Sequence, residues 1–136
     1  MFDIDVITTP HATDCGATCL AMLLSYYGIK VSVADLISEV GVSSVGCTAR
    51  SMRIVGNMHG LNLNAYGWGG AVVASMDRPS ICWWRYRHFV ICCGKDENGK
   101  VVIIDPDKGR YRLSVDSFAK LFTNVSLFNG IPEEFH

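Results

Sequence analysis

Three side chains, far apart along the chain, have the chemical types needed for nucleophilic acyl transfer. Cys15 begins a long apolar run, His88 opens the run HFVICC, and Asp105 closes the run VVIID. A thiolate is a nucleophile, an imidazole can take up and return a proton, and a carboxylate beside the imidazole holds it in one tautomer. The sequence therefore contains a complete set for this chemistry, provided that the fold brings the three together.

Cys15 follows Asp14 at the point where the chain enters a predicted helix. The unpaired N–H groups and the dipole of a helix N-terminus favour a thiolate there, and such a position can lower a thiol pKa from about 8.5 to roughly 3.5–7.5. Cys19, one turn further on, lacks this advantage. A cysteine at a helix start is more often a buried structural thiol, so the prediction requires a partner.

The partner is predicted from a hairpin. Between HFVICC and VVIID stands DENGK, whose Asn98-Gly99 pair is a strong signal for a tight turn between antiparallel strands. His88 starts one strand and Asp105 ends the other, so the two become neighbours at the same end of the hairpin. Taken singly, His88 could be a capping residue and Asp105 a turn residue. Together they predict Cys15 as nucleophile, His88 as base and Asp105 as the group that orients the base.

Other metal-binding or catalytic arrangements are less well supported. The remaining histidines, His11, His59 and His136, do not share the hairpin position. No Cys-x-x-Cys pair or zinc-finger spacing occurs, so we predict no metal and no cofactor. The cysteines, which we interpret as free thiols, are Cys15, Cys19, Cys47, Cys82, Cys92 and Cys93.

The composition indicates one folded domain over residues 1–136. Apolar residues make up 49% of the chain and charged residues 18%, which is typical of a chain with a core. The net charge of −1 offers no general attraction to nucleic acid or to anionic membranes. The N-terminus has no basic region ahead of an apolar stretch, and no apolar run approaches ~20 residues, so we expect neither a secretory signal nor a membrane span, and a cytoplasmic location.

The order of the predicted elements is typical of an α+β fold, with N-terminal helices packed on an antiparallel β-sheet. A buried helix is predicted over 15–27 before Gly28, a second helix after Ser32, whose capping partner is Asp35, and a third over 48–59. Strands are predicted at 61–66, 80–84, 88–93, 101–105, 111–114 and 125–128, with one more helix over 115–122.

With these residues in place, the runs TDCGATCLAMLLSYYGIKVSVADL, RPSICWWRYRHFVICCG and VVIIDPDKGRYRLSVDSFAKLF resemble the double-glycine leader peptidases, also called bacteriocin-processing peptidases. The resemblance spans almost the whole chain and implies a papain-like cysteine peptidase fold. The family's triad is the Cys of DCG, the His of HFV and the Asp of DP. These match Cys15, His88 and Asp105.

The resemblance also implies a substrate and a setting. The substrate is a precursor peptide of the bacteriocin, lanthipeptide or signal peptide type, cleaved after a Gly-Gly or Gly-Ala motif at the end of its leader, in a process coupled to export. Many members of the family are the N-terminal domain of a peptide-exporting ABC transporter on the cytosolic face of the bacterial plasma membrane, and others are separate proteins. Any ATP binding would then belong to a separate domain.

Two features of the sequence bear on the substrate cleft. Trp83, Trp84 and Tyr86, just before His88, are candidate cleft walls, although ordinary sheet packing explains such a cluster as well.

Family members usually carry a Gln that binds the oxyanion six residues before the nucleophile, and Thr9 stands there in this chain. Losing one oxyanion donor typically costs ~10²–10³ in turnover, and the backbone N–H of Cys15 remains, so we expect slower catalysis.

Two other functions remain open from the sequence. One is a catalytically weak or inactive docking domain that binds the leader of a precursor for a peptide exporter. The other is a different papain-like enzyme, such as an amidase or a transferase. An intact nucleophile at Cys15 favours the peptidase over the docking domain.

Overall fold

A computed structural model describes residues 1–9, 11–41 and 48–134, so Cys47 lies outside the described residues. The helices are η1 (Ala12–Asp14), α1 (Cys15–Tyr26), α2 (Val33–Val40), α3 (Ala49–Met58), α4 (Gly70–Ala74) and α5 (Val115–Leu121). The strands are β1 (Leu63–Tyr66), β2 (Ser80–Trp84), β3 (His88–Lys95), β4 (Val101–Asp105), β5 (Gly109–Leu113) and β6 (Phe122–Asn129). None of the helices in these ranges combines the length and the apolar character needed to cross a membrane.

Helix α1 is the centre of the helical layer, as its apolar sequence predicts. Every residue from Cys15 to Leu24 is buried, because α1 packs on β3 on one side and on α2 and α3 on the other. The buried hydroxyl of Thr18 donates to the backbone oxygen of Asp14 at 2.8 Å, which satisfies the polar group inside the core. The helix ends at Tyr26, and Gly28 follows in the left-handed region at φ 82°.

The two following helices begin at capped residues. Ser32 accepts a hydrogen bond from the backbone N–H of Asp35 at 3.1 Å, and Thr48 accepts one from Ser51, also at 3.1 Å. Ser51 completes a capping box by accepting from the N–H of Thr48. Caps of this kind each stabilise a helix by about 1 kcal/mol. The predicted second and third helices are confirmed.

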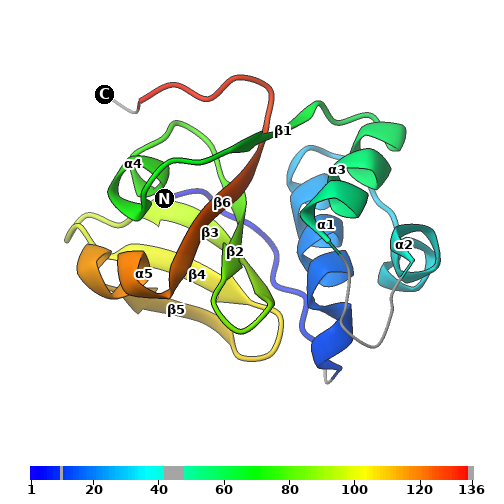
Figure 1. The fold of residues 1–136 in the computed structure, drawn as a ribbon, viewed down its shortest axis with the longest axis horizontal. Coiled ribbons are helices and arrows are strands. Elements are labelled where there is room, and N and C mark those ends of the chain that lie inside the picture. Colours follow the sequence, from blue (N-terminus) through cyan, green and yellow to red (C-terminus); the bar gives the residue numbers. More distant parts are fainter. Residues whose placement is uncertain (10, 42–47, 135–136) are drawn as a thin grey trace.

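The strands form one six-stranded antiparallel sheet in the order β1-β6-β2-β3-β4-β5. The hairpin predicted at Asn98-Gly99 joins β3 to β4, with Gly99 at φ 78°. Figure 1 shows α1, α2 and α3 on one side of the sheet and α4 and α5 on the other side. The predicted α+β architecture is confirmed.

Because helices cover both faces of the sheet, its central strands are apolar on both sides. Along β3, Phe89, Ile91 and Cys93 pack on the helical layer of α1, whereas Val90 and Cys92 pack on the α4 and α5 side. A strand buried on both faces has a nearly continuous apolar sequence instead of an alternating one. This explains the runs HFVICC and VVIID that flank the hairpin.

Helix α4 was not predicted from the sequence, because five residues are too few to show helical periodicity. It packs closely against α5. A Cβ added to Gly70 would lie 3.0 Å from the backbone Cα of Ala119, so glycine permits this approach. The ends of β5 and β6 also differ from the prediction: β5 begins at Gly109, and β6 begins at Phe122, directly after α5.

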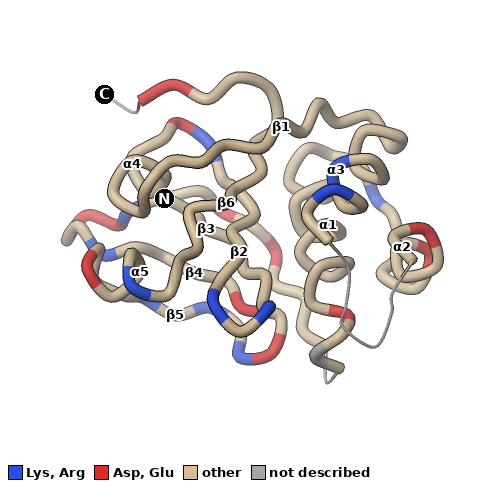
Figure 2. Tube along the Cα trace, in the orientation of Figure 1, with Lys and Arg blue, Asp and Glu red and all other residues tan. Residues whose placement is uncertain are grey.

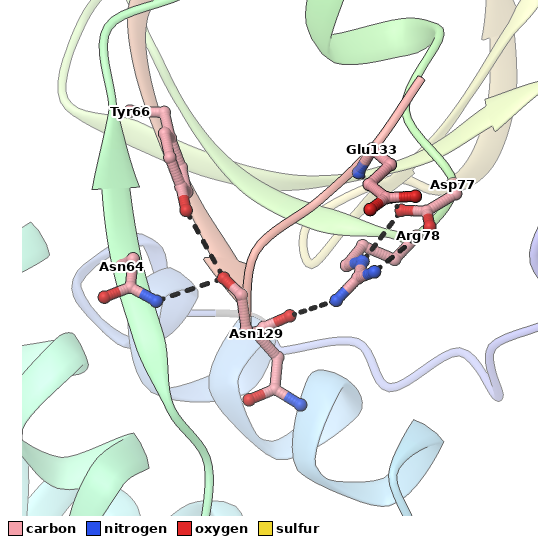
Figure 3. A network of polar contacts seen from close by, with 7 residues as sticks. Asn64, Tyr66, Asp77, Arg78, Asn129 and Glu133 are labelled. Atoms are coloured by element: carbon pink, nitrogen blue, oxygen red, sulfur yellow. Dashed lines mark hydrogen bonds and ion pairs between the residues drawn. The ribbon is translucent and has the colours of Figure 1, made fainter. Parts of the chain in front are cut away.

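A polar network ties the segment after β6 to the sheet (Figure 3). Arg78 donates to both carboxylate oxygens of Asp77 at 2.8 and 3.0 Å, and the backbone N–H of Glu133 donates to the same carboxylate at 3.1 Å. Asn64 donates to the carbonyl of Gly130 at 3.0 Å. The hydrogen bond from Arg78 lowers the pKa of Asp77 to about 2, so the pair stays charged across the neutral range.

Candidate active site

Three chain segments meet at one end of the sheet: the start of α1, the turn between β2 and β3, and the turn between β4 and β5 (Figure 1, lower edge). A cleft of about 690 Å³ lies among them, and Cys15, His88 and Asp105 all line it. The turn between β2 and β3 carries basic residues, whereas the turn between β4 and β5 carries acidic and basic residues (Figure 2). The structure thus brings together the three residues singled out from the sequence.

Cys15 is the first residue of α1. Its side chain is almost buried, at 5% exposure, yet it lines the cleft, and it lies where the N–H groups of the first helical turn have no partner within the helix. Cys19, one turn further along, is fully buried in the core and does not line the cleft. The two thiols of α1 therefore differ in position: Cys15 borders the cleft, and Cys19 lies in the core.

His88 and Asp105 are in direct contact: His88 Nε2 lies 2.9 Å from Asp105 Oδ1. The strand register differs from a simple face-to-face pairing. Ile91 pairs with Ile104 and Cys92 with Ile103, so continuing the register sets Asp105 beside Val90. His88 lies two residues further out and meets Asp105 diagonally, which is within the reach of a long side chain.

Asp105 is held by several donors. Its side chain is buried, at 3% exposure, and Oδ1 also accepts the backbone N–H of Asp107 at 2.8 Å. The Tyr111 hydroxyl donates to Oδ2 at the longer distance of 3.5 Å. Burial acts to raise the pKa of Asp105, but the hydrogen bonds from His88 and Asp107 outweigh it, so its pKa lies below the ordinary value of 3.8. The carboxylate is charged at neutral pH.

The pKa of His88 is raised from 6.5 to about 9. The hydrogen bond with Asp105 is the main cause, the Cys15 side chain is the second, and partial burial opposes both. At neutral pH the ring therefore carries a proton on each nitrogen. Because Nε2 is hydrogen-bonded to Asp105, Nδ1 is the ring nitrogen left to face the sulfur of Cys15. The imidazole thus connects the carboxylate to the nucleophile candidate.

Aromatic rings lie beside this pair. The Trp84 ring lies edge-on to the His88 ring at a centroid distance of 6.5 Å and to the Tyr111 ring at 6.4 Å. Trp84 and Tyr86 line the cleft, and Tyr86 is exposed at the turn with φ 68°. Trp83 instead stacks on Phe89 at 5.6 Å and packs on the helical layer, because neighbouring strand residues face opposite sides.

Thr9 lines the same cleft. Its backbone N–H donates to the carbonyl of Pro106 at 2.8 Å, which ties the N-terminal segment to the turn after β4. Its hydroxyl oxygen accepts the backbone N–H of His11 at 3.3 Å. Thr9 therefore lies in the same cleft as Cys15, where the sequence suggested it as an oxyanion donor.

Tyr111 is a site residue that the sequence reasoning missed. The pairing of Ile103 with Tyr111 and of Asp105 with Gly109 places Tyr111 on the β5 face that continues from Asp105. The period of two along β5 could have revealed it, had the register of β4 and β5 been known. Sequence alone does not give that register.

Among the described residues, no group of three or more His, Cys, Asp or Glu side chains is arranged to hold a metal ion. The described cysteines Cys15, Cys19, Cys82, Cys92 and Cys93 are free thiols, as predicted. Burial, together with the neighbouring Cys92, raises the pKa of Cys82 well above its usual value, which suits a structural thiol. Cys15 is the described cysteine that lines the active-site cleft.

The fold and the cleft define a cysteine peptidase domain. Residues 3–131 match the model of the Peptidase C39 family, and the chain belongs to that family. Its fold matches a double glycine motif protease from an AMS/PCAT transporter, solved in complex with the leader peptide, with a TM-score of 0.86 and 28% identity over 98% of this chain and 93% of that one. The predicted family and papain-like fold are confirmed.

Two further relatives extend the comparison. The peptidase domain of Streptococcus ComA, described as a bi-functional ABC transporter, has the same fold, with a TM-score of 0.83 and 21% identity over 94% of this chain and 97% of that domain. The lactococcin-G-processing and transport ATP-binding protein LagD of Lactococcus lactis is 29% identical over 90% of this chain. This chain spans only 18% of the length of LagD.

Proposed function

We propose that this chain is a peptidase domain that removes the leader from a ribosomally made precursor peptide by cutting after a Gly-Gly or Gly-Ala motif. In this proposal Cys15 is the nucleophile, His88 the general acid and base, and Asp105 the group that orients His88. The observation that carries it is that Cys15, His88 and Asp105 line one cleft, with His88 Nε2 2.9 Å from Asp105 Oδ1. Such a chain of contacts suits acyl transfer.

The reaction has two stages. The Cys15 thiolate attacks the carbonyl carbon of the glycine that ends the leader, and His88 gives its proton to the departing amine as the carbon–nitrogen bond breaks. His88, now neutral, then takes a proton from water, and the hydroxide attacks the thioester and releases the leader with a free carboxylate. Asp105 stabilises the imidazolium that is present before the first stage and after the second.

The oxyanion requires donors next to Cys15. The backbone N–H of Cys15 itself is at the helix start, and the Thr9 hydroxyl is on the cleft wall. The Thr9 hydroxyl can donate one hydrogen bond, and its side chain is shorter than that of the Gln usual in the family. We therefore expect turnover to be lower than in a family member with Gln at this position, but not lost.

Support for this substrate class comes from the relatives. LagD is named for lactococcin-G processing and transport, and the matching protease structure contains a leader peptide. Glycine at the cut site suits the cleft, because a residue without a Cβ allows the peptide backbone to approach a nearly buried thiol such as Cys15.

The setting follows from the same relatives and is part of the proposal. We assign residues 1–136 to one peptidase domain that works with an ABC transporter, either as part of the same chain or as a separate partner, on the cytoplasmic face of the bacterial membrane. ATP binding belongs to another domain of such an assembly. The domain itself acts on peptide and not on nucleic acid.

A synthetic precursor whose leader ends in Gly-Gly, followed by mass spectrometry, tests the proposal. The protein should release both product peptides, and Cys15→Ala should release neither while still binding the precursor. Cys19→Ala is the matched control, since it removes a thiol of the same helix that lies outside the cleft. Binding without cleavage by the unaltered protein would favour a docking domain, and the absence of both would favour an amidase or transferase.

A further inference from the structure

The active-site cleft continues beyond His88 along the side of the sheet that α5 covers. Trp84 from β2, Tyr111 and Leu113 from β5, and Leu121 from α5 line this continuation, which we call the release channel. It is continuous with the part of the cleft that holds Cys15. The channel walls thus come from three elements that lie far apart in the sequence.

The release channel is lined mostly by apolar side chains that are only partly buried in the core. Tyr111, Leu113 and Leu121 pack on the core cluster of the α5 side but are only half-buried, whereas Phe118 in the same cluster is fully buried. Tyr111 and Leu113 are two residues apart on β5, so they share a face and are spaced by roughly 6.6 Å. Side chains one and three of an extended peptide have the same spacing.

Two hydrogen bonds from Arg85 fix the α5 wall of the channel to the turn that follows β2. The backbone N–H of Arg85 donates to the carbonyl of Leu121, and its Nε donates to the carbonyl of Lys120, both at 2.8 Å. These bonds fix the end of α5 to the turn that follows Trp84. The wall that Leu121 forms is therefore tied in place in the free protein, so ordering it on binding costs little.

The chemistry of the site decides which part of a substrate enters the channel. In the proposed reaction His88 donates its proton to the departing amine, so the nitrogen of the first residue after the cut bond lies within hydrogen-bond reach of His88. Trp84 lies against His88, and Tyr111 contacts both Trp84 and Asp105. Thr9 and His11, which also line the cleft, belong to the N-terminal segment that leads into Cys15, and within the part of the chain that the structure describes they make no hydrogen bond or ring contact with Trp84 or Tyr111. The release channel is thus on the side of the leaving segment.

We infer that the release channel is a specificity site for the first three residues of the peptide that is set free, and that it favours an apolar side chain there. This inference rests on the proposed function and adds a second determinant of recognition beside the leader. The chemical class of ligand is an extended peptide segment with a free amine after cleavage and a leucine-like or aromatic side chain among its first three residues.

The experiment uses the whole chain and a set of precursors that share one leader ending in Gly-Gly. Leucine or aspartate is placed in turn at each of the first three positions after the cut, and kcat/KM is measured for each. At one position or more, leucine should exceed aspartate by about tenfold, as expected for an apolar pocket. The double variant Leu113→Asn, Leu121→Asn should reduce that ratio to less than about twofold.

Val72→Asn is the matched control, because Val72 is an exposed apolar residue on α4 outside the cleft, and it should leave both the ratio and the activity unchanged. A ratio near one at all three positions, in a protein that cleaves the precursors, would overturn the release channel while leaving the proposed function intact. Failure to cleave any precursor would overturn the proposed function itself. A ratio that persists in a folded double variant would also contradict the inference.

Discussion

His88 and Asp105 meet diagonally across the β3–β4 hairpin, with Nε2 and Oδ1 2.9 Å apart and with Asp105 almost fully buried. The diagonal contact fixes the orientation of the imidazole at the start of β3. Because Nε2 is used by Asp105, Nδ1 is left for Cys15 at the start of α1. This hydrogen bond thus determines which ring nitrogen is left to face Cys15, and it is the main cause of the rise in the His88 pKa to about 9.

Replacing Asp105 with asparagine should shift the pH dependence of cleavage. The neutral amide of Asp105→Asn lacks the charge that holds the His88 pKa near 9, so the basic limb of the kcat/KM profile should move from about pH 9 toward 6.5. Turnover at pH 7.5 should fall by about tenfold or more, since less of the ring can protonate the leaving amine. A pH series with one precursor checks this, and an unmoved basic limb would contradict the assigned role of Asp105.

The same pair should make stability depend on pH. The folded-state pKa of His88 is raised from 6.5 to about 9, so its contribution to the free energy of unfolding is fully present below pH 6.5 and is lost as the pH rises to about 9. Urea unfolding at pH 6, 7.5 and 9 should show this loss. His88→Ala should flatten the dependence over that interval, and an equally steep decline in the variant would assign it to other groups.

Thr9 should affect turnover more than binding. Thr9→Ala removes a hydroxyl from the cleft wall, and we expect kcat to fall by about threefold to tenfold with little change in KM, since a hydroxyl is a weaker oxyanion donor than an amide. Thr9→Gln should raise kcat above that of the unaltered protein. Steady-state kinetics on a Gly-Gly precursor measure both, and an unchanged kcat in the two variants would exclude Thr9 from oxyanion binding.

A side chain at Gly70 of α4 should destabilise the folded protein. A Cβ there would meet Ala119 Cα at 3.0 Å, so Gly70→Ala should lower the free energy of unfolding by about 1–3 kcal/mol. Gly69 is the matched control, because a Cβ at that position has nothing within 4 Å. Gly69→Ala should cost less than about 1 kcal/mol. Equal losses in the two variants would show that the contact between α4 and α5 is unimportant.

The sequence by itself determined the local parts of the site. Capping residues such as Ser32 and Thr48 define helix starts, and Asn98-Gly99 defines a hairpin, because these effects act over a few residues. The hairpin alone brings His88 near Asp105. The same local reasoning placed Cys15 at a helix start, and all of these features are present in the fold.

Only the tertiary structure decided how the parts meet. The approach of α1 to the end of β3, the diagonal register that leaves Nδ1 of His88 for Cys15, and the presence of Tyr111 beside Asp105 all depend on contacts between segments far apart in the chain. That Trp84 and not Trp83 lines the cleft depends on which face of the sheet borders it. Such choices depend on burying two faces of one sheet at once, and no local pattern in the sequence contains that information.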